Sequence, residues 1–229
     1  MLTLVIWGQM GMNNWNSLNM FLIDSVHDWI MFVVAAVLSV VLVWMFSLYL
    51  SGFMVNRFLV GHEMLEIIWS VIPICLLGFL MGPSLSGLYT TENLGDSSMT
   101  LKVMGSQWFW SYEYPDFDIE GYSSYMLSED DLRPGDYRNL EVDNSVILPS
   151  GLPIRVVISS EDVAHSWTIP VLGVKMDAIP GRLNEIRLFS GKSGLMYGQC
   201  SEICGSLHSF MPIKVEMIPS KEFLNTIAK

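Results

Sequence analysis

The chain has 229 residues, of which 51% are hydrophobic and 15% are charged, and its net charge is −11. A soluble protein carries roughly 25% charged residues, so this composition argues against an ordinary cytosolic domain and against a disordered chain. The acidic balance also argues against a nucleic-acid partner, whose phosphates need Lys and Arg. A cationic partner fits the charge better.

An uncharged run of 22 residues, 29–50, predicts a transmembrane helix. At about 1.5 Å per residue it reaches roughly 33 Å, enough to cross the hydrocarbon core. Asp24 and Asp28 precede this run and no Lys or Arg does, which is unlike a cleaved secretory signal. We therefore expect residues 1–28 to form a retained segment outside the membrane.

A second uncharged run, 67–89, predicts a second span that contains Pro73 and Pro83. Membrane helices tolerate proline where neighbouring groups satisfy the freed carbonyls. The loop between the spans holds Arg57, whereas the N-terminal segment has no basic residue, so the loop is expected inside and both termini outside. Residues 29–89 are thus predicted to form a two-helix transmembrane hairpin.

Glu66 lies at the mouth of the second span, where its carboxylate has two interpretations. A carboxylate at a membrane boundary is commonly solvated by headgroup water. Ionisable groups deeper in the bilayer are usually functional.

Residues 90–229 have the pattern of an all-β domain, because short β-branched and aromatic runs alternate with turn signals. The expected strands are 101–114, 154–160, 184–190, 195–199 and 212–218. In the last of them Ile213, Val215 and Met217 share one face. Strands at this spacing predict a sandwich or Greek-key barrel.

The segment 198–213, GQCSEICGSLHSFMPI, carries four potential soft ligands within twelve residues: Cys200, Cys204, His208 and Met211. Thiolate, thioether and imidazole together suit copper. Structural zinc or an iron–sulfur cluster would leave Met211 unused. Because the flanking runs predict strands, we expect a metal-binding loop between two β-strands.

Two thiolates are one more than a mononuclear blue-copper site uses, but they can bridge two copper ions. Such a pair needs one further imidazole from outside the loop. His27 and His62 lie beside the predicted spans, which leaves His165 in the β domain.

Four segments resemble motifs of the cytochrome c oxidase subunit II family, mitochondrial type: CSEICG with HSFMPI, SSEDVAHSW, DAIPGR and MGSQWFWSYEYPD. The resemblance runs from about residue 24 to about residue 222. It implies a cupredoxin-like domain at 90–229 with a dinuclear, mixed-valence copper centre, CuA. It further implies a respiratory-chain translocase subunit that accepts electrons from cytochrome c and passes them to haem a of the catalytic subunit I. That subunit reduces O2 to water, coupled to proton pumping.

The implied location is the mitochondrial inner membrane, with the CuA domain and both termini in the intermembrane space. The implied copper ligands are Cys200 and Cys204, which bridge the ions, His165 and Met211 on one ion, and His208 and the Glu202 carbonyl on the other. The Glu202 carboxylate is implied as a ligand of a magnesium ion shared with the catalytic subunit.

Between residues 92 and 143 the sequence has twelve acidic residues against three basic ones. Much of such a run is solvated surface, but a concentrated negative field also steers a basic partner, and cytochrome c is basic in this family's systems. The docking candidates are Glu113, Asp116, Asp143 and Asp162. The resemblance makes Trp108 the residue through which the electron enters, although the cluster Trp108-Phe109-Trp110 could equally serve packing. Phe109 stands where a tyrosine is common in relatives, so a hydroxyl there is not essential.

For Glu66, in the segment LEIIW, the resemblance favours proton uptake at the inner-side mouth of a channel in the catalytic subunit. Three rival functions differ in their sites. A quinol oxidase subunit II lacks the copper ligands, and a nitrous oxide reductase is much larger, with many more histidines. A membrane-anchored copper chaperone or store would have an open, exchangeable site.

Overall fold

The computed structural model describes residues 11–52, 58 and 60–227. These residues form two compact units, one within Leu22–Thr90 and the other made of residues 11–21 with 91–227. The boundaries that we predict at residues 28 and 89 refer to the membrane and stay predictions.

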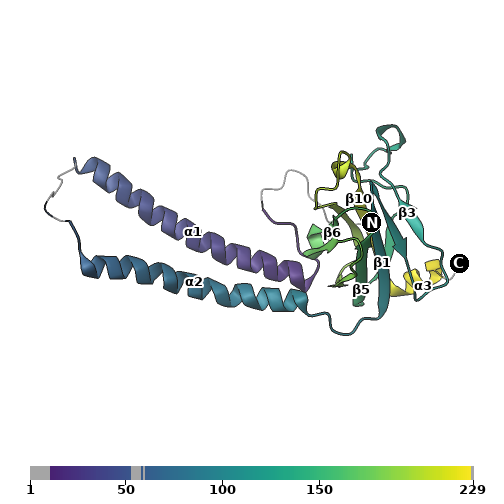
Figure 1. The fold of residues 1–229 in the computed structure, drawn as a ribbon, viewed down its shortest axis with the longest axis horizontal. Coiled ribbons are helices and arrows are strands. Elements are labelled where there is room, and N and C mark those ends of the chain that lie inside the picture. Colours follow the sequence, from purple (N-terminus) through teal and green to yellow (C-terminus); the bar gives the residue numbers. More distant parts are fainter. Residues whose placement is uncertain (1–10, 53–57, 59, 228–229) are drawn as a thin grey trace. The chain divides into compact units, whose positions relative to one another are not determined.

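The first unit consists of two long helices, α1 (Leu18–Leu50) and α2 (Glu63–Glu92), shown in Figure 1. Both are long and apolar enough to cross a membrane, and the apolar window of each has none of its residues buried. Within the pair, Trp29 of α1 packs edge-to-face on Phe79 of α2, with 5.8 Å between ring centroids. The two predicted apolar helices are thereby confirmed. Arg57, on which the predicted orientation depends, lies outside the described residues.

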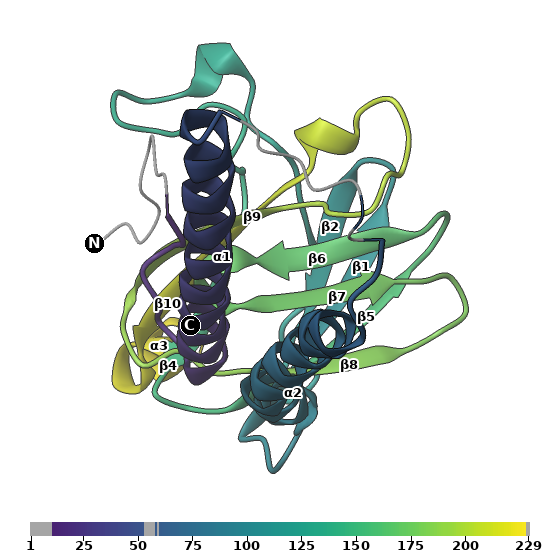
Figure 2. The same cartoon turned by 90° about the vertical axis from the view of Figure 1, so that its left-hand side faces the viewer.

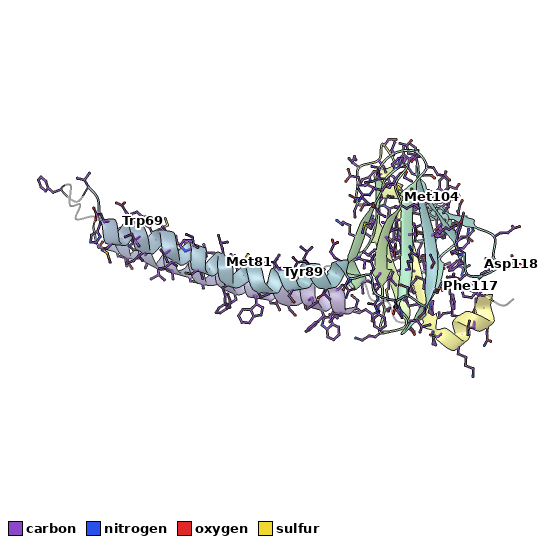
Figure 3. The ribbon with its side chains drawn as sticks, turned by 60° about the horizontal axis from the view of Figure 1, so that its bottom comes forward. Trp69, Met81, Tyr89, Met104, Phe117 and Asp118 are labelled. Atoms are coloured by element: carbon purple, nitrogen blue, oxygen red, sulfur yellow. The ribbon has the colours of Figure 1, made fainter. Side chains whose placement is uncertain are left out.

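The outer surface of the helices is apolar along their length. Figure 3 shows Trp69, Met81 and Tyr89 spaced along α2, and these side chains are largely exposed. Exposed apolar side chains over about 30 Å of helix are stable in lipid rather than in water.

Polar groups fix the start of each helix. Ser17 precedes α1, and its Oγ accepts a hydrogen bond of 3.0 Å from the Met20 N–H, as an N-cap does. At α2, the Nδ1 of His62 accepts a bond of 3.2 Å from the Leu65 N–H. Both helices therefore begin before the uncharged runs that predict them.

The second unit is a β domain whose described strands form three sheets. The strands are β1 (Met99–Ser106), β2 (Phe109–Glu113), β3 (Tyr122–Ser124), β4 (Val146–Ser150), β5 (Ile154–Ser160), β6 (His165–Ile169), β7 (Val174–Ala178), β8 (Asn184–Leu188), β9 (Gly194–Gln199) and β10 (Pro212–Pro219). A five-stranded sheet has the order β3-β2-β1-β5-β8, a three-stranded sheet β4-β10-β9, and a two-stranded sheet β6-β7. The pairs β1–β5 and β4–β10 are parallel, and the others are antiparallel. The predicted all-β sandwich is confirmed.

One strand prediction is wrong. The run 101–114 forms two antiparallel strands, β1 and β2, because the chain reverses at Gln107-Trp108 and pairs Ser106 with Phe109. The reversal contains no proline and no Asn-Gly pair, so the sequence pattern predicts one continuous strand across it. The run Pro149-Ser150-Gly151 predicts a turn, but this turn starts two residues too early, since Pro149 and Ser150 belong to β4. β4 pairs only with β10, and an edge strand accommodates a proline.

The core lies between the sheets and is made of fully buried side chains from most strands. Ile213, Val215 and Met217 of β10 are each 0% exposed, which confirms the predicted alternation, while Lys214 and Glu216 are half-buried. A packed core of this kind transmits strain and moves little, so it can hold loops at fixed positions.

Two functional candidates project from the same end of the sandwich. In Figures 1 and 2 the teal loop containing the 3₁₀ turn Glu129–Asp131 and the yellow-green loop between β9 and β10 lie at one end of the β domain. Helix α3 (Ser220–Ile227) lies at the other end, where Phe223 packs on Phe117. The loop with the acidic turn Glu129–Asp131 and the cysteine loop therefore lie at the same end, whereas Asp116 precedes Phe117, which packs on α3 at the other end.

Candidate metal centre

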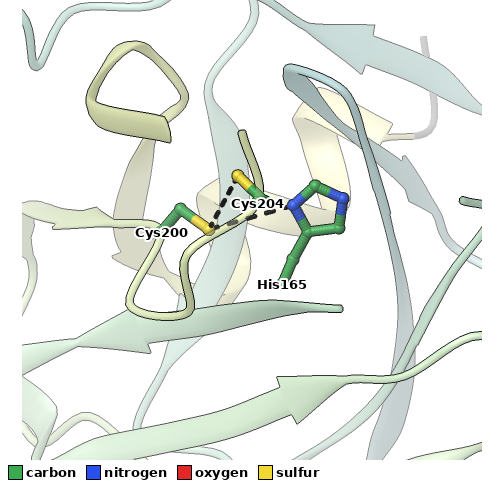
Figure 4. Close-up of side chains that lie close together, drawn as sticks. All are labelled: His165, Cys200 and Cys204. Atoms are coloured by element: carbon green, nitrogen blue, oxygen red, sulfur yellow. Dashed lines mark hydrogen bonds between the residues drawn. The ribbon is translucent and has the colours of Figure 1, made fainter. Parts of the chain in front are cut away.

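The site is built around a pair of buried thiols. Cys200 and Cys204 are 6% and 4% exposed, and their Sγ atoms lie 3.9 Å apart. A disulfide would require about 2.05 Å, so both are free thiols. The Nδ1 of His165 lies 3.9 Å from the Cys200 Sγ, which completes a buried cluster (Figure 4).

Three further donors surround the same sulfur pair. The His208 Nδ1 lies 3.4 Å from the Cys204 Sγ, and the Met211 Sδ lies 3.6 Å from it. The backbone carbonyl of Glu202 accepts a hydrogen bond of 3.4 Å from the Cys200 thiol. The structure thus brings together the six predicted donor groups, while their coordination to metal stays a prediction.

The loop is closed by the strands that carry it. β9 ends at Gln199 and β10 begins at Pro212, and these two residues are partners in the antiparallel ladder. The Trp110 Nε1–H donates to the Met211 carbonyl at 3.2 Å, and the Ser201 N–H donates to the Ser166 carbonyl at 3.0 Å. The predicted loop between two strands is confirmed, and it is fastened to β2 and β6.

Two glycines let the segments approach. A Cβ on Gly105 of β1 would lie 2.9 Å from the His165 Cδ2, so only glycine leaves room for that ring. A Cβ on Gly198 of β9 would overlap the Thr168 carbonyl of β6. The strands that carry Cys200 and His165 therefore touch backbone to backbone.

His165 is the first residue of β6 and is fully buried. Its Nε2 lies 2.9 Å from the Asp162 Oδ1, and the Trp110 ring packs on it at an interplanar angle of 63°. With the hydrogen on Nε2 donated to the carboxylate, Nδ1 presents its lone pair toward Cys200. A metal-binding histidine commonly donates one ring N–H to a carboxylate and keeps the other nitrogen for the metal, and His165 has this arrangement.

The electrostatics of the metal-free site favour neutral sulfur and a charged carboxylate. Burial, and after it the neighbouring Cys200, raise the pKa of the Cys204 thiol to about 12. For Asp162, burial acts to raise the pKa, but hydrogen bonds from His165, Val163 and Gln107 outweigh it, and the pKa lies below its usual value. A cation entering the site would displace the thiol proton, because the thiolate is the ligand form.

The donor set fits copper. Two sulfurs, two imidazoles, a thioether and a carbonyl match a soft metal. A zinc site of Cys and His would make no use of Met211, which is 1% exposed and directed at the Cys204 sulfur.

Trp108 lies against the loop. A Cβ on Gly205 would lie 3.0 Å from the Trp108 Cζ2, and the φ of Gly205, +132°, also favours glycine. The indole is therefore in contact with the backbone next to Cys204. Trp110 is fully buried and holds the other side of the loop through its bond to the Met211 carbonyl, so both tryptophans contact the loop.

The docking candidates are all anchored by hydrogen bonds or ion pairs. Glu113 pairs with Lys102 at 3.1 Å, Asp116 accepts the Thr100 N–H, and Asp143 accepts the Tyr125 N–H at 2.7 Å. These three carboxylates are exposed. The side chain of Asp162 is 32% exposed and bonded to His165.

Glu66 lies in the first turn of α2 and is exposed. Its Oε1 accepts a hydrogen bond of 3.4 Å from the His62 N–H, so the side chain helps to cap the helix. This contact is compatible with both interpretations of Glu66.

Two features at the site carry little signal in the sequence. The Gln107 Nε2–H donates to the Cys204 carbonyl at 2.7 Å, and only its position before Trp108 draws attention to it. Glu141, 4% exposed, accepts hydrogen bonds of 2.6 Å from both Lys214 and Tyr197. That buried cluster joins the acidic segment to β9 and β10, and it depends on contacts remote in sequence.

Comparison with known families supports one assignment along most of the chain. Residues 99–218 match the family "Cytochrome C oxidase subunit II, periplasmic domain", and residues 5–86 match "Cytochrome C oxidase subunit II, transmembrane domain". The β domain is similar to a crystal structure of the periplasmic domain of subunit II of cytochrome oxidase, CoxB, of Bradyrhizobium japonicum. The identity is 43%, the coverage is 59% of this chain and 95% of that chain, and the TM-score is 0.55.

A second solved structure is similar over the same share of the chain. It is a mixed disulfide intermediate between the thioredoxin-like TlpA and the CoxB periplasmic domain, with 40% identity, 59% and 92% coverage, and a TM-score of 0.52. The two family matches together span both the helical pair and the β domain. The chain belongs to the cytochrome c oxidase subunit II family.

Proposed function

We propose that this chain is the electron-accepting subunit of a cytochrome c oxidase, with a dinuclear CuA centre in its β domain. The observation that carries the proposal is the convergence of six donor groups on one buried pair of thiols. In this proposal Cys200 and Cys204 would bridge two copper ions. His165 and Met211 would hold one ion, and His208 and the Glu202 carbonyl would hold the other.

When bound, the two copper ions would supply a one-electron couple shared through the bridging sulfurs. The chain's own residues hold the donors still. The ladder closes the loop at Gln199 and Pro212, and Asp162 orients the His165 ring. Donors fixed by a packed core change position little between oxidation states, which favours fast electron transfer.

Electrons enter from cytochrome c through Trp108 and leave to haem a of the catalytic subunit I. The contact of Trp108 with Gly205 supports this route, as does the position of the acidic turn Glu129–Asp131 at the same end of the β domain as the cysteine loop. Glu113, Asp116, Asp143 and Asp162 are the docking carboxylates of the proposal. Their field would raise the rate of encounter with a basic partner.

The remaining parts of the proposal concern the assembly. The carboxylate of Glu202, an exposed residue of the loop, would hold a magnesium ion shared with the catalytic subunit. The chain serves O2 reduction and proton translocation that occur in that subunit. Its helical pair anchors it in the mitochondrial inner membrane, although the relative whose organism is given is bacterial.

Metal analysis and electron spin resonance of the purified full chain in detergent test the proposal. Two copper ions per chain and a mixed-valence signal delocalised over both nuclei are expected. One copper per chain, or a site that prefers zinc, would contradict it. A centre that loads two coppers but takes no electron from reduced cytochrome c would instead indicate a copper store.

A further inference from the structure

The carboxylate of Asp162 accepts hydrogen bonds from three residues of its own chain. Its Oδ1 accepts hydrogen bonds from the Val163 N–H at 2.6 Å and from His165 at 2.9 Å. Its Oδ2 accepts the Gln107 N–H at 2.6 Å. The carboxylate therefore accepts three hydrogen bonds from its own chain, and one of them comes from a predicted copper ligand.

Gln107 continues the connection to the other side of the site. Its backbone N–H binds Asp162, and its side-chain amide donates to the Cys204 carbonyl at 2.7 Å. The next residue along the chain is Trp108, whose indole touches Gly205 of the same loop. One hydrogen-bonded chain, His165–Asp162–Gln107–Cys204, therefore joins two predicted ligands that lie on different segments.

These hydrogen bonds fix the orientation of the His165 ring and the position of the reversal at Gln107-Trp108, neither of which core packing alone determines. They set which nitrogen of His165 faces the sulfur pair, because the Asp162 bond occupies Nε2. They also tie the reversal at Gln107-Trp108 to the cysteine loop, although that reversal has no turn residue of its own.

Building on the proposed function, we propose that Asp162 and Gln107 are positioning residues of the copper centre. Together they fix the positions of His165, the loop backbone at Cys204, and Trp108 before metal binds. Asp162 thus acts through His165 rather than mainly through its charge at the surface. Gln107, which carries no charge, acts in the same unit.

The test uses the full chain in detergent, with Asp162→Ala, Asp162→Asn and Gln107→Met. Glu185→Gln is the matched control, because the Glu185 side chain is 30% exposed against 32% for Asp162 and also holds an ion pair, with Arg155. The first readout is the imidazole nitrogen spectrum of metal-free protein labelled on histidine. The second is the rate at which copper leaves the loaded protein to a chelator.

Wild type should show His165 with its hydrogen on Nε2, and Asp162→Ala should lose this preference. Removing such a partner of a metal-binding histidine costs roughly 10- to 100-fold in metal affinity, so copper should leave Asp162→Ala faster by about that factor. Gln107→Met should also release copper faster, by a smaller factor, while Glu185→Gln matches wild type. Asp162→Asn should fall between wild type and Asp162→Ala, because the amide oxygen still accepts one N–H.

Unchanged histidine spectra and copper release in Asp162→Ala and Gln107→Met would overturn the proposal and leave Asp162 as a docking charge. Gln107 is exposed, so Gln107→Met keeps the test valid if Asp162→Ala does not fold. Failure of the proposed function looks different, because wild type itself would then hold no pair of copper ions.

Discussion

The Cys204 sulfur contacts three other donor groups of the site, those of Cys200, His208 and Met211. Replacing it with serine should abolish the dinuclear centre, because a hydroxyl stays protonated near neutral pH and is a poor ligand for soft ions. Electron spin resonance and copper content measure the result. Cys75→Ser is the control, because Cys75 is an exposed cysteine of α2 and should leave both values unchanged. A normal mixed-valence signal in Cys204→Ser would refute the bridging role.

Trp108 allows transfer to be separated from binding at a single residue. Trp108→Ala should leave the association of cytochrome c nearly intact and slow the transfer step at least tenfold, because it removes the ring that contacts the loop at Gly205. Stopped-flow kinetics at saturating cytochrome c report that step directly. Phe109→Ala is the control, since Phe109 stacks on Tyr125 and not on the loop. Equal transfer rates in wild type and Trp108→Ala would remove Trp108 from the route.

At the scale of elements, β10 is tied to the acidic segment by a buried ion pair. Lys214 and Glu141 lie 2.6 Å apart with side chains 16% and 4% exposed, and Tyr197 of β9 also donates to Glu141. Lys214→Met leaves a buried carboxylate without its cation, which costs about 3 to 5 kcal/mol. The thermal midpoint of the β domain, followed by tryptophan fluorescence, should fall.

The double variant Lys214→Met/Glu141→Gln should recover most of that loss, because it removes both buried charges. The same variants also test whether docking of cytochrome c depends on this ion pair, since Glu141 belongs to the acidic segment between residues 92 and 143. If Lys214→Met is as stable as wild type, the ion pair does not hold the segment in place.

The sequence was sufficient to predict the elements with strong local signals. The two helices follow from uncharged runs, and β10 follows from its alternation, which the burial of Ile213, Val215 and Met217 confirms. Four strands were not predicted: β3, β4, β6 and β7. β6 is buried at every position and so has no alternation to detect, whereas β7 does alternate apolar and charged residues but over only five positions. The reversal between β1 and β2 was missed because a contact with Asp162, remote in sequence, takes the place of a turn residue.

The candidate site shows the same division. Five of its six donor groups come from one short loop, and the histidine count selected His165 for the sixth. Gln107 and the Glu141–Lys214 pair could not be found this way, because their importance depends on which remote carbonyl or carboxylate the fold brings to them.

At the scale of the whole molecule, the chain carries a net charge of −11, and twelve of its acidic residues lie between residues 92 and 143. Neutralising Glu113, Asp116 and Asp143 together should slow association with cytochrome c about tenfold at low salt and flatten its salt dependence, because charge acts on encounter. Copper content should stay at the wild-type value. Association that is equally fast and equally salt-dependent in the triple variant would show that other carboxylates guide the partner.

Glu66, in the first turn of α2, is the residue of the helical pair whose proposed role in proton uptake can be tested. Glu66→Gln keeps the hydrogen bond to the His62 N–H and removes titration, so the cap should survive. If Glu66 takes up protons, oxidase turnover should drop several-fold while reduction of the copper centre by cytochrome c stays fast. Turnover at the wild-type rate from about pH 6 to about pH 9 would instead identify Glu66 as a boundary and capping residue.

The close approach of β9 and β6 at Gly198 makes the metal centre vulnerable at a position that offers no ligand. Any side chain there must push the Thr168 carbonyl away, and this separates the strand that leads into Cys200 from the strand that begins at His165. The substitution would disturb packing between the two strands, and the measurable result would be a lower copper content. A variant at Gly198 would keep every donor atom. In a screen for lost respiration it would nevertheless be classified with the variants that lose a metal ligand.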